Sequence, residues 1–223
     1  MDRTSYTNLA KAWEFVEDHT FSRQSVELNA VRTRAEETGI AQGSAAQAEL
    51  LRVLVHMIGA SSVIAVGTGS VVETLQLVNG LENGGQLTAV DSSSQGIALI
   101  HTLFNHLSDE IQTTLRAVNA PAGVFLPRLN AETYDLIVVA GDPGNYDASF
   151  EQAPRLLKSH GVIVFTDMLA FESAESAGGV LNPANRDAKS VAMRALLETV
   201  ESDERFVTTL TPTGTGLLVA VKR

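Results

Sequence analysis

The sequence has no cysteine and no excess of basic residues, and both absences limit what the protein can do. Without cysteine, disulfides, thiolate metal sites and cysteine nucleophiles are all excluded. The net charge of −10, with no cluster of Lys and Arg against it, disfavours a nucleic-acid backbone or an anionic membrane surface as a partner. No apolar run reaches the roughly 18 residues of a membrane span, and the first residues do not resemble a secretory signal. We therefore expect a cytoplasmic protein that binds neither nucleic acid nor membrane.

What the sequence does contain is enough apolar material for a folded core. Hydrophobic residues make up 44% of the chain and charged residues 19%, which is typical of a globular domain and not of a disordered chain. The 223 residues fit a single globular unit, which we divide into an N-terminal helical segment (1–40) and a main domain (41–223). At the start of this domain, Ser44 is placed to cap a helix that runs to Gly59.

From Ser62 onward, short apolar runs alternate with segments of helical period. The runs are SVIAV (62–66), QLTAV (86–90), a weaker TTLRAV (113–118), YDLIVVA (134–140) and GVIVFTD (161–167). Strands that are apolar on both faces and separated by helices predict a parallel sheet covered on both sides. The last two runs, RFVTTLTP and GTGLLVAVKR, are separated only by a short turn, which predicts an antiparallel hairpin. We expect an α/β, doubly wound Rossmann-like sheet, mostly parallel, with a C-terminal antiparallel hairpin and added N-terminal helices.

The turn VGTGS after the first of these runs is the strongest candidate for a cofactor site. Gly67 and Gly69 let the backbone approach a ligand at the end of a strand. Asp91 ends the next run, where its carboxylate can accept both hydroxyl protons of a ribose or simply cap the following helix. A dinucleotide-binding turn would have a third glycine at Val72, and its absence disfavours an NAD-dependent oxidoreductase.

The order of these segments resembles the caffeoyl-CoA and catechol O-methyltransferase family of class I methyltransferases. The matching segments are VIAVGTGS, LTAVDSSS, YDLIVVAGDPGNY, LLKSHGVIVFTDML and MRALLETVESDERF, followed by TPTGTGLLVAVK. The resemblance implies S-adenosylmethionine as the cofactor, a small-molecule hydroxyl as the methyl acceptor, and a homodimer. The cofactor-binding residues that it implies are Gly67, Thr68, Gly69, Ser70, Asp91, Ser92, Asn119 and Ala120.

Several positions depart from the pattern of this family. Ala65 stands where the family has an acidic residue that lies close to the cofactor. Family members hold a divalent ion with three ligands, and here Ala140 and Met168 replace two of them, which leaves Asp167. Pro143 stands where a lysine usually assists deprotonation. Because one carboxylate does not hold Mg²⁺ well against water, we expect a methyltransferase that works without the metal of the family.

Asp142, Tyr146 and Asp167 are the residues expected at the acceptor site. Asp142 lies two positions beyond the missing ligand. With Asp167 it could bind a metal weakly, act as a general base for a substrate hydroxyl, or cap a helix. Tyr146 matches a family tyrosine near the methyl-transfer pocket, although it could equally pack against the next helix. The same departures leave open an alternative function, a catalytically inactive methyltransferase fold that binds a ligand or takes part in an assembly.

Overall fold

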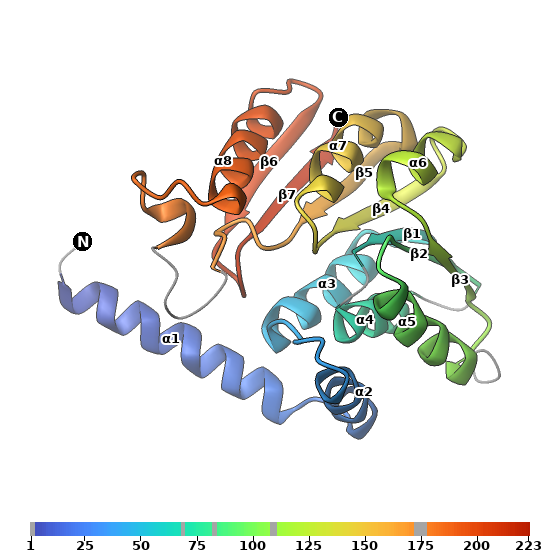
Figure 1. Cartoon of the computed structure of the whole chain (residues 1–223), viewed down its shortest axis with the longest axis horizontal. Coiled ribbons are helices and arrows are strands. Elements are labelled where there is room, and N and C mark those ends of the chain that lie inside the picture. The colour runs from blue at the N-terminus through green and yellow to red at the C-terminus, as the bar shows by residue number, and fades with distance from the viewer. Residues whose placement is uncertain (1–2, 68–69, 82–83, 108–110, 172–177) are drawn as a thin grey trace.

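The protein is built around a seven-stranded sheet with the strand order β3-β2-β1-β4-β5-β7-β6 (Figure 1). The computed structural model describes residues 3–67, 70–81, 84–107, 111–171 and 178–223. Strands β1 to β5 pair in parallel, whereas β7 pairs antiparallel with both β5 and β6. The strands are β1 (Ser62–Val66), β2 (Gln86–Asp91), β3 (Thr114–Asn119), β4 (Tyr134–Val139), β5 (Leu157–Phe165), β6 (Phe206–Thr211) and β7 (Leu217–Lys222). The predicted doubly wound sheet with its terminal antiparallel hairpin is confirmed.

Helices cover both faces of this sheet (Figure 1). One face packs against α2 (Val26–Glu37), α3 (Ala45–Met57), α4 (Val71–Gly80) and α5 (Ser94–Leu107). The other face packs against α6 (Ala122–Phe125), α7 (Gly144–Leu156) and α8 (Ala188–Glu201), with short 3-10 turns at η1 (Leu126–Arg128) and η2 (Gly179–Leu181). Along β1, Val63 and Ala65 face the first group of helices, and Ile64 and Val66 face the second. This alternation explains why β1 is apolar at each position from Val63 to Val66.

Helix α1 (Arg3–Ser22) lies outside these two layers and is joined to them at the start of α3 (Figure 1). Ser44 caps α3 as predicted, because its hydroxyl oxygen accepts a hydrogen bond from the Gln47 amide at 3.0 Å. The carboxylate of Glu17 in α1 accepts two further hydrogen bonds, from the amides of Ala45 (2.5 Å) and Ala46 (3.2 Å). A negative charge is favourable at the amino end of a helix, so this contact fixes α1 to α3. Of the helices in the described residues, none combines the length and apolar character that crossing a bilayer requires.

Candidate functional site

A cleft of about 560 Å³ opens at the carboxyl ends of the central strands. Strands β1 and β4 are neighbours in the sheet, but the chain leaves β1 toward β2 and returns to β4 from the other side. Ligands of open α/β sheets bind in the crevice at such a switch point. The cleft is lined by the turn after β1, the ends of β2, β4 and β5, and the amino ends of α3 and α4. Its volume lies within the range of pockets that hold small molecules or cofactors.

The floor of the cleft depends on Gly67 in the turn after β1. Gly67 has a φ of +78°, and a Cβ placed on it would lie 2.1 Å from the carbonyl oxygen of Ala140. No other residue fits there without moving the backbone. The same carbonyl accepts a hydrogen bond at 3.1 Å from the buried amide side chain of Asn145, which holds it in place. Of the other residues predicted in this turn, Ser70 lines the cleft, whereas Thr68 and Gly69 lie outside the described residues.

The end of β2 brings Asp91 and Ser92 into the cleft beside the glycine turn, as a ribose site would require. The Asp91 carboxylate also accepts a hydrogen bond from the Ser93 amide at 2.8 Å, so it stabilises the local turn as well. Asn119 and Ala120 both bind the backbone carbonyl of Asp91, the first through its side-chain amide (3.0 Å) and the second through its main-chain amide (2.9 Å). These two hydrogen bonds hold the Asp91 backbone in place from the end of β3 and the turn that follows it. Contact of Asn119 and Ala120 with a cofactor stays a prediction.

The predicted acceptor residues occupy different environments. Asp142 and Asp167 line the cleft, and Asp142 accepts a hydrogen bond from the Gly144 amide at 2.8 Å near the start of α7. Tyr146 lies in the core, where its hydroxyl donates to the carbonyl oxygen of Thr166 at 3.1 Å. Burial raises the pKa of the Tyr146 hydroxyl above its ordinary value. In this arrangement Tyr146 holds the end of β5 behind the cleft, and a direct role in methyl transfer stays a prediction.

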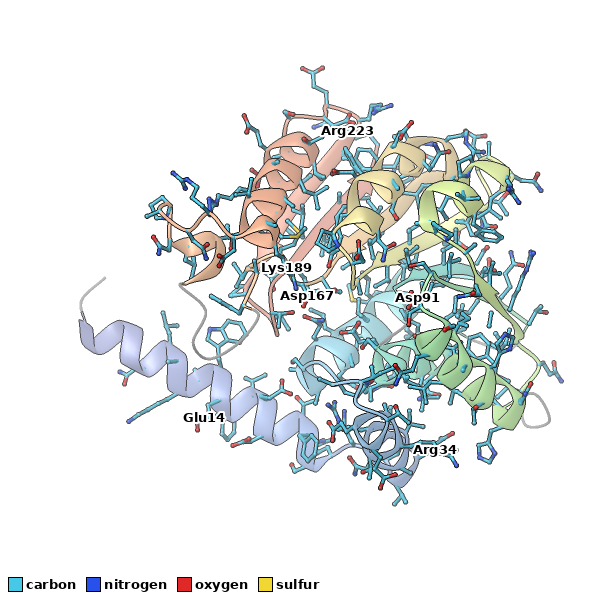
Figure 2. All side chains as sticks on the ribbon, viewed as in Figure 1. Glu14, Arg34, Asp91, Asp167, Lys189 and Arg223 are labelled. Atoms are coloured by element: carbon cyan, nitrogen blue, oxygen red, sulfur yellow. The ribbon has the colours of Figure 1, made fainter. Side chains whose placement is uncertain are left out.

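The residues around Asp167 do not match the divalent-ion site of the caffeoyl-CoA and catechol O-methyltransferase family. One oxygen of Asp167 accepts a hydrogen bond from the Thr215 hydroxyl at 2.5 Å, and the other lies 3.8 Å from the Lys189 ammonium (Figure 2). Ala140 provides no side-chain ligand, and the Met168 side chain is buried in the core. In the described part of the chain, no group of three or more His, Cys, Asp or Glu is placed to hold a metal ion. The cation that the structure places beside Asp167 is the Lys189 ammonium.

Sequence reasoning missed a fourth acidic residue of the cleft, Glu73 in the first turn of α4. Glu73 is 5% exposed, and its carboxylate accepts a hydrogen bond from the Gln47 side chain at 2.6 Å. The Gln47 oxygen in turn accepts one from the Thr215 amide at 3.3 Å. Glu73, Gln47, Thr215 and Asp167 thus form one polar chain across the cleft. Burial raises the pKa of Glu73 to about 7, the nearby Asp167 charge adds to the rise, and the hydrogen bond from Gln47 opposes it.

The residues around Glu73 match a sequence pattern that has a purely local explanation. Ser70 followed three residues later by Glu73 matches the capping box that begins many helices. In the structure, however, the Ser70 side chain makes no capping bond. The Gln42 side chain caps α4 instead, accepting a hydrogen bond from the Val72 amide at 3.1 Å. The sequence signal that could have indicated Glu73 was a charged residue within the largely apolar helix VVETLQLVNG. In the structure, nearly every residue of this helix is buried.

Comparison with known proteins identifies the family. Residues 16–223 match a family model described as O-methyltransferase. The chain belongs to the O-methyltransferase family. It is 32% identical over 195 residues to a Mycobacterium marinum protein named "Putative O-methyltransferase", covering 87% of this chain and 84% of that protein. A Mycobacterium leprae protein with the same description is 33% identical over the same length and the same shares.

Solved structures of O-methyltransferases share the fold of this one. The O-methyltransferase from Bacillus cereus in complex with SAH has a TM-score of 0.80 at 20% identity, covering 96% of this chain and 99% of that one. The O-methyltransferase TomG from Streptomyces achromogenes, in complex with SAM, has a TM-score of 0.75 at 19% identity, covering 95% and 97%. The family resemblance inferred from the sequence motifs is therefore confirmed.

In this O-methyltransferase, the substitution Glu73→Gln should stabilise the fold at neutral and alkaline pH. The pKa of Glu73 rises from 4.5 to about 7 on folding, so between these values the folded chain keeps a proton that the unfolded chain releases. The free energy of unfolding therefore falls as pH rises through this window, by roughly 3 kcal/mol at about 1.4 kcal/mol for each pH unit. The glutamine side chain of the variant cannot titrate, so the variant should lack this fall. Urea unfolding of both proteins between about pH 4 and pH 8 measures the difference.

The matched control is Glu198→Gln on the exposed side of α8. This substitution should leave the pH profile of stability unchanged. If the pH profile of stability for Glu73→Gln also parallels that of the unsubstituted protein, the burial of Glu73 does not cause the loss of stability at higher pH.

Proposed function

We propose that the protein is an S-adenosylmethionine-dependent O-methyltransferase that methylates a hydroxyl of a small molecule without a divalent metal. Family membership and the two similar structures in complex with SAH or SAM support the cofactor. The observation that carries the metal-free chemistry is the position of Lys189. Its ammonium lies 3.8 Å from Asp167, the single carboxylate left from the expected ligand set.

The cofactor would be held at the glycine turn and the end of β2. Gly67 allows close approach, Ser70 lies in the cleft, and Asp91 with Ser92 is placed for the ribose. Thr68, Gly69, Asn119 and Ala120 complete the proposed set. When bound, S-adenosylmethionine supplies a methyl group on a sulfonium, which is already a good leaving group. The main task of the protein is therefore to place an acceptor oxygen in line with that methyl group.

Asp142, Asp167 and Lys189 give the acceptor end of the cleft its chemistry. A carboxylate of Asp142 or Asp167 can accept the proton of the acceptor hydroxyl. Lys189 can stabilise the negative charge that develops on the oxygen, as a metal ion would otherwise do. Lys189 sits in the first turn of α8, where the helix dipole disfavours a cation. This unfavourable position of a cation is consistent with a functional role, because residues that oppose local structural preferences are concentrated at active sites.

Metal independence can be tested directly. We expect transfer of labelled methyl from S-adenosylmethionine to catechols or simple phenols to proceed at the same rate, within about twofold, with a chelator or with added Mg²⁺, since no ion stabilises the oxygen. A rate that depends on Mg²⁺ would refute the metal-free proposal. Calorimetry with S-adenosylhomocysteine tests the cofactor separately, because absence of binding at millimolar ligand would refute the enzyme and favour an inactive fold.

Replacing Lys189 tests the observation on which the chemistry rests. Lys189→Gln should lower kcat by about 10- to 100-fold, because one charged group that stabilises the oxygen is lost. The KM for S-adenosylmethionine should change little, because Lys189 lies at the acceptor end. Lys11→Gln on exposed α1 is the control and should leave both parameters unchanged. An unchanged kcat for Lys189→Gln would remove Lys189 from the mechanism.

We also propose that the protein forms a homodimer through α1. This helix carries several large apolar side chains that are between 40% and 68% exposed, namely Leu9, Trp13, Phe15, Val16 and Phe21. A second copy of the same helix would cover them. Light scattering should then give twice the chain mass of 23.7 kDa, and substituting Trp13 and Phe15 by Ser should return the mass of one chain. A single-chain mass for the unsubstituted protein would contradict the dimer.

A further inference from the structure

The buried carboxylate of Glu73 has no part in the mechanism described so far. A carboxylate taken out of water is costly unless a cation or several hydrogen bonds compensate it. Within the part of the chain that the structure describes, Glu73 forms no salt bridge. Its hydrogen bond at 2.6 Å comes from the uncharged Gln47 side chain, and the neighbouring Ser70 side chain, also uncharged, favours the ionised form as well. The site is therefore built to hold a carboxylate but does not itself supply a full counter-charge.

The charged groups that face Glu73 come from two other elements. Asp167, at the end of β5, disfavours the ionised form of Glu73, and Arg32 of α2 favours it. The Nη1 atom of Arg32 donates to the carbonyl oxygen of Gly43 at 3.0 Å and lies 3.9 Å from Glu36, so Arg32 acts on Glu73 through its charge and not through an ion pair. With Asp91 and Asp142 also lining the cleft, acidic groups outnumber the one lysine beside Asp167. The cleft suits a ligand that carries positive charge.

S-adenosylmethionine is such a ligand, because its sulfonium and its α-ammonium are cations and only its α-carboxylate is an anion. If the ribose were held at Asp91 and the methyl group faced Asp167, the amino-acid end of the cofactor would lie beside the glycine turn. Glu73 of α4 and Gln47 of α3 are among the polar groups that line this side of the cleft, and Glu73 is the charged one of the two. A carboxylate there can bind an ammonium group through a charge-assisted hydrogen bond.

The position of Glu73 also accounts for the missing acid of the glycine motif. Ala65, which replaces that acid, faces the side of the sheet covered by α3 and α4. Glu73 reaches the cleft from α4, the helix that covers this same side. We propose that Glu73 binds the α-ammonium group of S-adenosylmethionine, so that α4 supplies the carboxylate that β1 lacks. This inference rests on the cofactor of the proposed function.

Gln47 positions this carboxylate and links it to the acceptor end. Its amide nitrogen holds Glu73, and its oxygen accepts a hydrogen bond from the Thr215 amide. Gly214 packs so closely that a Cβ there would lie 2.4 Å from the Gln47 oxygen. The Gln47 side chain is therefore fixed at both ends, and Glu73 is held in one orientation before any ligand arrives. Such preorganisation reduces the entropy cost of binding.

Two ligands that differ only at the amino-acid end provide the test. S-adenosylhomocysteine carries the α-ammonium, whereas 5′-methylthioadenosine keeps the nucleoside and the thioether but lacks the amino acid. By calorimetry, Glu73→Gln should bind S-adenosylhomocysteine about 10- to 100-fold more weakly, the loss of one charged hydrogen bond. It should bind 5′-methylthioadenosine within about twofold of the unsubstituted protein. Glu73→Asp keeps the charge on a shorter side chain, so its affinity for S-adenosylhomocysteine should lie between those of the unsubstituted protein and Glu73→Gln. The control Glu198→Gln should bind both ligands with the affinity of the unsubstituted protein.

Proton release gives a second readout that a purely structural role would not produce. At about pH 6.5, an ammonium bound to Glu73 favours its ionised form, so binding of S-adenosylhomocysteine should release a proton. The calorimetric enthalpy should then differ between phosphate and imidazole buffers for the unsubstituted protein and not for Glu73→Gln. Proton uptake instead would mean that a protonated Glu73 donates to the ligand carboxylate, and the inference would be wrong.

The possible failures are distinguishable. If the unsubstituted protein does not bind S-adenosylhomocysteine at all, the proposed function fails and this inference falls with it. If it binds and Glu73→Gln binds equally well, only the inference fails. Equal weakening of both ligands would also overturn it, because the effect would then not lie at the amino-acid end.

Discussion

The close approach of the turn after β1 to the end of β4 is the constraint on which the cleft depends. Gly67 lies against the carbonyl oxygen of Ala140 with no room for a side chain, and Asn145 holds that carbonyl from α7. The hydrogen bond from the Gly67 amide to the carbonyl of Val90 joins the same turn to β2. Three neighbouring strands therefore end around one glycine. The turn after β1, the end of β2 and the end of β4 are placed relative to one another by this contact.

A second feature, the polar chain from Glu73 through Gln47 and Thr215 to Asp167, crosses the cleft over this floor. Its members come from α4, α3, the β6–β7 turn and the end of β5. Asp167 is held with a φ of +57°, a left-handed conformation that costs a residue with a side chain on the order of 1 kcal/mol or more. The strain is maintained by the amide of Met168, which donates to the carbonyl of Gly216 at 3.1 Å. The antiparallel hairpin thus shapes the acceptor end as well as closing the sheet.

The fold could be predicted from the sequence because it follows from local patterns. Apolar strands on both faces, helices between them and the tight turn at Gly214 each have a direct physical meaning, and so does the cap at Ser44. The positions of Asp91 and Asp167 could be predicted for the same reason, since both follow strands whose carboxyl ends share one edge. Glu73 and Lys189 could not, because both lie on helices, where the direction of a side chain depends on tertiary packing. The pattern Ser70-x-x-Glu73 even favoured a local role, and Gln42, remote in sequence, took that role instead.

The attachment of α1 has a consequence for the cleft itself. Glu17 binds the first amides of α3, and Gln47, which orients Glu73, belongs to that same turn of helix. The N-terminal helix and the cofactor end of the cleft are thus coupled through one helical turn, although α1 stands outside the main layers (Figure 1). A displacement of α1 would therefore be felt first at the start of α3, one residue before the side chain that orients the buried carboxylate.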